Sequence, residues 1–124
     1  PERFLVEVPA EAAIEFDPGH LHQVIWNLLT NAVRYARAEP AAIRISARTA
    51  GDRVELSVID NGPGVPPSSL AQLFEPFFTT DSLGTGLGLY LARELCAANR
   101  ALLEYVREAS GAHFRVVARS PSRP

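Results

Sequence analysis

The sequence contains no lysine and no methionine, and its 12 basic side chains are all arginines. Without lysine, the chain cannot form a GxxxxGK[ST] phosphate-binding loop, the strand lysine of serine/threonine protein kinases, or a lysine Schiff base. No initiator methionine is present either, and the chain opens on Pro1. We therefore expect these residues to be an excised domain of a longer protein.

Cysteine, net charge and long apolar runs are scarce as well. Cys96 is the only cysteine, which excludes an internal disulfide and a multi-cysteine zinc site and predicts a buried structural thiol in a reducing, cytoplasmic setting. A formal charge of -2 gives no electrostatic reason to bind nucleic acid or an anionic membrane. The longest apolar runs are far below the roughly 20 residues that a membrane span requires.

Alternating apolar and polar residues predict short strands over 4–8 and 13–16, each with one face buried. Residues 43–48 and 54–59 alternate on either side of Gly51-Asp52, which predicts a β-hairpin. Residues 102–106 and 113–118 are predicted to form a closing strand pair, joined at Ser110-Gly111.

A long helix is predicted from Pro18 to Arg37, with Asp17 as its N-cap. Its apolar stripe consists of Leu21, Val24, Ile25, Leu28, Leu29, Ala32, Val33 and Ala36. A short helix is expected over 70–73 and another over 87–99, with Leu91, Leu95 and Ala98 facing inward. This order predicts a two-layer α+β sandwich over residues 1–119: a mixed, mostly antiparallel sheet of about five strands, covered on one face by about three helices. Residues 120–124 are expected to be a disordered tail.

Four segments are richer in polar and glycine residues than folding requires. In the first, Gln23, Asn27 and Asn31 recur every four residues along the long helix and are continued by Arg34 and Tyr35. Asparagine is a poor helix former, so this edge is either simply hydrated or binds a ligand. Carboxamide oxygens also suit a Mg²⁺ ion that keeps most of its waters.

The second segment, Asp60-Asn61-Gly62-Pro63-Gly64-Val65, follows a hydrophobic strand directly. Asn-Gly and Pro-Gly favour a turn by themselves. However, a carboxylate at the end of a buried strand needs a hydrogen-bond donor, and the exocyclic amine of a bound base would serve. Gly62 and Gly64 would let the backbone approach that ligand closely.

The remaining two segments flank a loop. The run 74–80, FEPFFTT, places three aromatic side chains around a proline, which is also typical of a small satellite core. The run 84–89, GTGLGL, opens a helix, and free N–H groups at a helix N-terminus suit phosphate. No strand directly precedes these glycines, which argues against a dinucleotide-binding fingerprint.

Together and in this order, the four segments resemble the catalytic, ATP-binding domain of bacterial sensor histidine kinases, within the Bergerat-fold (GHKL) ATPases. The matching boxes are HQVIWNLLTNAVRYA, DNGPGV, FEPFF and GTGLGL, and the resemblance covers roughly residues 17–99. The short lid and FEPFFTT look most like the nitrogen-regulation kinase group. The run YLARELCAANRALLEYV is similar to the type IV pilus sensor kinases.

The resemblance implies a role for each matching residue. Asn31 would coordinate Mg²⁺ with support from Asn27, Arg34 would reach the phosphates, and Tyr35 would lie against the adenine or ribose. Asp60 would accept a hydrogen bond from the adenine amine, and Gly62 and Gly64 would shape that pocket. Asn27, Asn31 and Arg34 would form the catalytic set. The other cofactor-binding residues implied are Phe78, Thr79, Thr80, Gly84, Thr85, Gly86, Leu87 and Gly88, with Phe74, Phe77 and Phe78 anchoring one end of the lid.

Gyrase-like members of the superfamily carry a glutamate as general base where this chain has Asn27, which cannot accept a proton. The resemblance therefore implies a kinase whose acceptor is a histidine. His20, His22 and His113 lack the surroundings of a phosphoacceptor, so the acceptor is expected on a separate dimerisation and phosphotransfer domain, with a response regulator further downstream. The fragment is expected to be monomeric, and its parent a homodimer anchored in the bacterial inner membrane.

Two alternatives remain open from the sequence. One is a degenerate module of this fold that binds nucleotide or only protein, and the other is a gyrase-like or anti-sigma relative. Asp81 stands where the family's lid often carries lysine, which predicts weaker nucleotide binding, a lid that closes only against its partner domain, or a simple solvated carboxylate.

Overall fold

The computed structural model describes residues 4–9, 12–78, 86–107 and 111–121. Five strands form one sheet in the order β1-β2-β3-β5-β4. Their bounds are β1 Phe4–Glu7, β2 Ile43–Ala50, β3 Arg53–Asp60, β4 Leu102–Val106 and β5 Ala112–Arg119. β1 pairs with β2 in parallel and the other three pairings are antiparallel, which confirms the predicted mixed, mostly antiparallel sheet.

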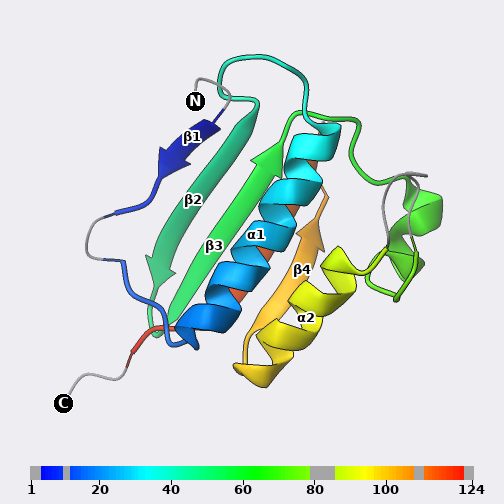
Figure 1. Ribbon diagram of the computed structural model, residues 1–124. Coiled ribbons are helices and arrows are strands. Elements are labelled where there is room, and N and C mark those ends of the chain that lie inside the picture. Colours follow the sequence, from blue (N-terminus) through cyan, green and yellow to red (C-terminus); the bar gives the residue numbers. More distant parts are fainter. Residues whose placement is uncertain (1–3, 10–11, 79–85, 108–110, 122–124) are drawn as a thin grey trace.

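The helices α1, Pro18–Tyr35, and α2, Gly88–Ala98, lie side by side on one face of the sheet, and α1 packs on β3 (Figure 1). A 3-10 helix, η1, spans Pro67–Gln72. The other face of the sheet carries no helix in the described part of the chain (Figure 1). The predicted two-layer α+β sandwich is therefore confirmed.

The core lies between the sheet and the two α-helices. It contains Val24, Leu28 and Ala32 of α1, Ala92 and Cys96 of α2, and alternate residues of the central strands, namely Leu56, Val58, Phe114, Val116 and Ala118. α1 begins where predicted, because the Asp17 carboxylate accepts the His20 N–H at 2.9 Å. That backbone donor lowers the pKa of Asp17, an acid at the exposed start of the helix.

The register between β3 and its neighbours brings the ends of distant segments together. Asp60 is paired with Ile43 of β2 on one side and with Ala112 of β5 on the other. The last residue of β3 therefore lies at the same edge of the sheet as the loop before β5. This edge also faces the C-terminal end of α1, because Asn61 Oδ1 accepts the Arg37 N–H at 2.7 Å.

Several boundaries and burial patterns differ from the sequence prediction. Residues 13–16 form no strand: Glu15 donates one backbone hydrogen bond to Arg119, while Ile14 and Phe16 pack against the core. Alternating apolar and polar residues do not form a β-strand unless a neighbouring strand is available for continuous hydrogen bonding. The strand β1 is exposed on both faces because it is the sheet edge beyond the helices.

The helices were also predicted with errors. α1 ends at Tyr35 rather than Arg37, and Val33 is 41% exposed because it points away from the sheet. In α2 the inward residues are Ala92 and Cys96, whereas Leu91 is 45% exposed and Ala98 is exposed. Only Leu95 of the three predicted inward residues packs against the core. Burial raises the pKa of the Cys96 thiol to about 12, as expected of a structural cysteine.

The chain's C-terminal residues are only partly described. Ser120 donates a backbone hydrogen bond to Asp52, so the described beginning of the predicted tail is held against the hairpin turn. Residues 122–124 lie outside the described residues, so the predicted disorder of the tail stays a prediction there. None of the described helices has the length and apolarity that crossing a membrane demands.

Candidate functional site

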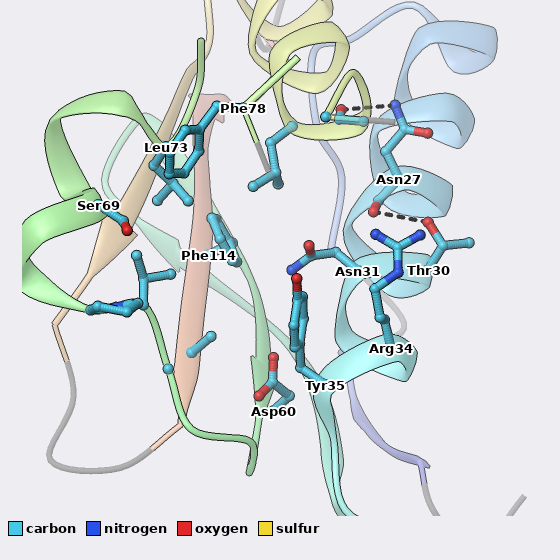
Figure 2. Close-up of a pocket in the computed structure, with 17 residues that line it drawn as sticks. Asn27, Thr30, Asn31, Arg34, Tyr35, Asp60, Ser69, Leu73, Phe78 and Phe114 are labelled. Atoms are coloured by element: carbon cyan, nitrogen blue, oxygen red, sulfur yellow. Dashed lines mark hydrogen bonds between the residues drawn. The ribbon is translucent and has the colours of Figure 1, made fainter. Parts of the chain in front are cut away.

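A pocket of about 220 Å³ lies between α1, the loop after β3, η1 and the start of α2. Figure 2 shows α1 contributing Asn27, Thr30, Asn31, Arg34 and Tyr35 on one side, with Ser69, Leu73 and Phe78 on the opposite side. Asp60 lies at one end and Phe114 forms the wall between the two sides (Figure 2). Residues of all four predicted motifs therefore meet in one cavity, although residues 79–80 of the third motif and 84–85 of the fourth lie outside the described residues.

Asp60 is a buried carboxylate at the end of β3 with 4% of its surface exposed. Its Oδ1 accepts the Gly62 N–H at 2.8 Å. Burial raises the pKa of Asp60, and the backbone N–H donors of Gly62 and Ala112 offset part of that rise. The site thus has an acceptor that is incompletely satisfied by the protein and faces the cavity.

The glycines around Asp60 make backbone packing contacts that the sequence did not predict. A Cβ at Gly62 would overlap the Tyr35 carbonyl oxygen, so this glycine allows the loop to pack on the end of α1. Gly62 does not line the pocket, and its predicted approach to a ligand stays a prediction. Gly64 does line the pocket; its φ is 76° and a Cβ there would lie 2.7 Å from the Gly111 carbonyl oxygen.

Gly111 was not predicted as part of the site. Its φ is 79°, and a Cβ there would overlap the backbone oxygen of Asp60. No side chain fits between the start of β5 and the end of β3. The backbone around Asp60 is therefore held by contacts that glycine alone permits.

Asn27 and Asn31 lie one turn apart on α1 but have different surroundings. Asn27 is 9% exposed; its Oδ1 accepts from Gln23 at 2.8 Å and its Nδ2 donates to the Gly88 carbonyl at 3.2 Å (Figure 2). The Asn31 carboxamide points into the pocket and makes no hydrogen bond to any residue that the structure describes (Figure 2). Asn27 thus connects the two helices, while Asn31 keeps its oxygen for a ligand.

Arg34 and Tyr35 both line the pocket, and the contacts with phosphates and base predicted for them stay predictions. The Tyr35 ring stands between Asp60 and Asn31, and the Arg34 guanidinium lies beside Thr30 (Figure 2). Arg34 is the one basic side chain among the residues that line the described cavity. Its charge makes that side of the pocket attractive to anions.

The predicted glycine-rich helix start is only partly described. Gly86 and Gly88 line the pocket, whereas Leu87 does not line it. A Cβ at Gly88 would meet no atom within 4 Å, so the fold itself does not require glycine there. Thr79, Thr80, Gly84 and Thr85, and with them Asp81, lie outside the described residues, so the roles predicted for them stay predictions.

A backbone hydrogen bond joins two described residues that flank the segment 79–85. Phe77 N–H donates to the Gly86 carbonyl at 2.8 Å, and both residues have positive φ angles, 67° and 75°. The Phe77 side chain is 73% exposed, so its contact with Gly86 is made through its main chain, and its anchoring of the lid stays a prediction. Phe74 packs edge-on against Phe114 at 6.2 Å, with the Arg93 guanidinium 5.7 Å from its ring, and Phe78 lines the pocket.

Eight pocket residues were missed by the sequence analysis: Thr30, Val65, Pro66, Ser69, Leu73, Leu89, Ala112 and Phe114. The helical spacing from Asn27 and Asn31 could have identified Thr30. Val65 belongs to the second motif and Leu89 to the fourth, although neither was assigned a role. Phe114 and Ala112 carry no local signal, because only strand register places β5 beside Asp60.

The three histidines lie outside the pocket lining. His20 contacts Asn99 through its ring nitrogen at 3.0 Å, and His113 is buried with Nε2 2.9 Å from Ser57 Oγ. His22 is exposed on α1. Within the described ranges, no cluster of three or more histidine, cysteine, aspartate or glutamate side chains is arranged to hold a metal ion.

Comparison with known proteins gives one family. Residues 16–122 match the family described as histidine kinase-, DNA gyrase B-, and HSP90-like ATPase. The sensor protein kinase PilS of Pseudomonas aeruginosa is 47% identical over 112 residues, which cover 86% of this chain and 21% of PilS. The nitrogen regulation protein NtrY of Azorhizobium caulinodans is 37% identical over 95 residues, which cover 72% of this chain and 12% of NtrY.

A solved structure gives the same result. The crystal structure of full-length ShkA in complex with AMPPNP has a TM-score of 0.82 and 33% sequence identity to this chain. The similarity covers 97% of this chain and 26% of the ShkA chain. This chain therefore spans a minor part of each of these relatives.

Proposed function

The chain belongs to the family of histidine kinase-, DNA gyrase B- and HSP90-like ATPases, and from this premise we propose that it is the catalytic domain of a sensor histidine kinase. It binds Mg-ATP in the pocket and donates the γ-phosphate to a histidine on a separate dimerisation and phosphotransfer domain. The family expected from the four motifs is confirmed by the family match and by the relatives PilS and NtrY.

The observation that carries the proposal is the pairing of Asp60 and Asn31 in one cavity. Asp60 offers a buried acceptor for the amine of an adenine, and Asn31 offers an unbonded carboxamide nearer the start of α2. An exocyclic amine that donates to Asp60 would stabilise its ionised form, which burial disfavours. The ShkA structure was solved with the ATP analogue AMPPNP, which supports the same class of ligand here.

Magnesium fits the residues that are present. Mg²⁺ keeps several waters and is held by one or two protein oxygens together with substrate phosphates. The Asn31 oxygen is available for this role, and the described part of the chain contains no competing carboxylate cluster. Bound Mg²⁺ would neutralise charge on the phosphates, while Arg34 supplies a second positive charge from the same helix edge.

Asn27 favours phosphoryl transfer over hydrolysis. Its carboxamide cannot accept a proton, and its two polar ends already bond Gln23 and Gly88. The site therefore lacks an activated base at this position, and water would be a poor nucleophile. Catalysis by this chain rests on positioning the nucleotide and neutralising the charge of its phosphates. Transfer then requires a better nucleophile than water, such as an imidazole nitrogen.

The acceptor histidine belongs to another domain under this proposal. His20 and His113 are engaged with Asn99 and Ser57, and neither lines the pocket. The relatives extend far beyond the length of this chain, which is consistent with a larger sensor kinase. We propose that the parent is a membrane-anchored homodimer whose phosphohistidine supplies a response regulator.

Phosphoryl transfer tests the proposal directly. Purified chain is mixed with γ-labelled ATP and Mg²⁺, with and without the parent's histidine-bearing domain, and label on protein and release of free phosphate are measured. We expect acid-labile, alkali-stable label on the added domain only, together with negligible hydrolysis by the isolated chain. A variant of that domain lacking its acceptor histidine is the matched control.

The alternatives predict other results. Rapid steady-state hydrolysis by the isolated chain would favour a gyrase-like ATPase. Absence of any Mg-ATP binding by calorimetry would favour a degenerate interaction module of the same fold. Transfer to serine or threonine of the added domain, shown by acid-stable label, would instead place the chain with anti-sigma relatives.

A further inference from the structure

Tyr105 lies outside all four motifs and does not line the pocket, yet it contacts the pocket wall. It belongs to β4 and is half-buried on the face of the sheet that packs against the helices. Its ring packs edge-on against Phe114, with ring centres 5.2 Å apart and an angle of 65° between the planes. Phe114 itself lines the pocket, so Tyr105 lies directly behind the Phe114 ring.

The hydroxyl of Tyr105 is bonded to the loop after β3. It accepts the backbone N–H of Val65 at 3.0 Å in a partly buried position. Gly64, Val65 and Pro66 all line the pocket, and together they are called the Gly64–Pro66 wall. The bond to Tyr105 therefore acts on this wall. Gly64 also packs on Gly111, which in turn packs on Asp60.

Few other bonds hold this wall in place. Residues 63, 66 and 67 are prolines and have no N–H to donate. Asn61 and Gly62 are held by Ala42 and Asp60, and Ser69 bonds locally to Pro66. Across residues 63–68, and counting only described partners, the bond to Tyr105 is the one that ties the wall to the sheet.

We infer that Tyr105 is a positioning residue for the nucleotide pocket, acting by holding the Gly64–Pro66 wall in its binding conformation. This inference rests on the proposed function. Without the hydroxyl, the wall samples other positions, and the apparent affinity falls by the fraction of molecules that keep the binding conformation. The wall adjoins the Asp60 end, so the loss should be common to nucleotides that share the same base.

The test compares Tyr105→Phe with the wild-type chain in calorimetric titrations with Mg-ATP and with Mg-ADP. One lost hydrogen bond of about 1 kcal/mol corresponds to roughly three- to tenfold weaker binding. We expect this factor to be the same for ATP and ADP. Exchange of the Val65 amide hydrogen, followed by NMR, should also become faster in the variant.

Two further variants separate positioning from general stability. Tyr90→Phe makes the same chemical change on α2, where Tyr90 bonds no described residue through its hydroxyl and does not line the pocket. It should bind both nucleotides as the wild type does. Tyr105→Leu also removes the ring contact with Phe114, so it should lower the melting temperature more than Tyr105→Phe.

The outcomes distinguish this inference from the proposed function. If the wild-type chain binds neither nucleotide, the proposed function fails. If the wild type binds and Tyr105→Phe binds equally well, only the positioning role is overturned. The same conclusion follows if ATP and ADP are weakened by clearly different factors, or if Tyr90→Phe weakens binding as much as Tyr105→Phe.

Discussion

The Asp60 end of the pocket and the polar edge of α1 differ in what holds them. At the Asp60 end, Gly62 and Gly111 allow backbone contacts that a Cβ would block, and the carboxylate is buried. On the polar edge, defined as Asn31 and Arg34, the Asn31 carboxamide has no described partner and Arg34 is exposed. The Asp60 end is held in place by backbone packing, whereas the polar edge has side-chain groups that can bind a ligand.

The difference gives a rule for substitutions. Substitutions that add atoms at the Asp60 end should change both the free energy of unfolding and the nucleotide affinity, because the same backbone contacts stabilise the fold and shape the pocket there. Changes on the polar edge should alter binding with little effect on folding. The four predictions below test this rule, from the largest expected effect to the smallest.

Gly111→Ala should cause the largest loss of stability. Its Cβ would overlap the backbone oxygen of Asp60, and its φ of 79° is unfavourable for alanine. We expect the free energy of unfolding in urea to fall by about 3 kcal/mol or more, as for other severe steric changes. Gly51→Ala is the matched control: its φ is 65° but its Cβ would meet no atom within 4 Å.

In that control only the backbone preference is lost, at a cost of about 1 to 2 kcal/mol. Equal losses in Gly111→Ala and Gly51→Ala would show that the close packing on Asp60 is not what makes glycine necessary. Nucleotide binding by Gly51→Ala should be unchanged, because Gly51 lies in the β2–β3 turn away from the pocket.

Asp60→Asn should weaken Mg-ATP binding by about 100-fold, because a buried charged acceptor is replaced by a neutral one that also presents an NH₂ group. The asparagine oxygen can still accept the Gly62 N–H, so the loop should keep its conformation. Calorimetry measures the affinity and urea unfolding measures the stability. Unchanged affinity would mean that Asp60 does not contact the base.

The free energy of unfolding of Asp60→Asn gives a second prediction for the same variant. Burial raises the pKa of Asp60, so its ionisation opposes folding, and this penalty develops as the pH rises from the unfolded-state pKa to the raised one. Asp60→Asn removes the penalty and should be at least as stable as the wild type at pH 7. Conversely, ATP affinity of the wild type should weaken as the pH falls through the raised pKa of Asp60, because base binding requires the carboxylate.

Asn31→Ala should weaken Mg-ATP binding by about tenfold or more, with a much smaller effect when Mg²⁺ is omitted. Its free energy of unfolding should stay the same or rise slightly, since alanine favours helix and no hydrogen bond to a described residue is lost. Asn27→Ala is the contrasting variant, because it breaks the bonds to Gln23 and Gly88 and should lower stability. Equal destabilisation by both variants would contradict the rule.

Gly88→Ala should have the smallest effect on folding. Nothing lies within 4 Å of its Cβ, and alanine at a helix position is favoured over glycine by up to about 1 kcal/mol. Thermal unfolding should therefore show an unchanged or slightly raised melting temperature, with weaker nucleotide binding if phosphate lies against this backbone. A marked fall in melting temperature would show that α2 needs glycine for folding.

Much of the site could be predicted because each of its polar groups is marked by a local sequence pattern. The four-residue spacing of Asn27 and Asn31 places them on one helix edge whatever else the chain does. Asp60 was found because a carboxylate directly after a hydrophobic strand must be at a buried strand end. These signals depend on local geometry, and the pocket contains all three residues.

Contacts between distant segments gave no such signal. The sequence determined the strands of the hairpin, the extent of α1 to within two residues, and the polar groups of the site, because short-range periodicity and turn chemistry specify them. Only the tertiary structure decided that Gly62 packs on the end of α1, that Asn27 is bonded to α2, and that Tyr105 accepts a hydrogen bond from Val65. Each depends on strand register and helix packing, which join residues that no local pattern relates.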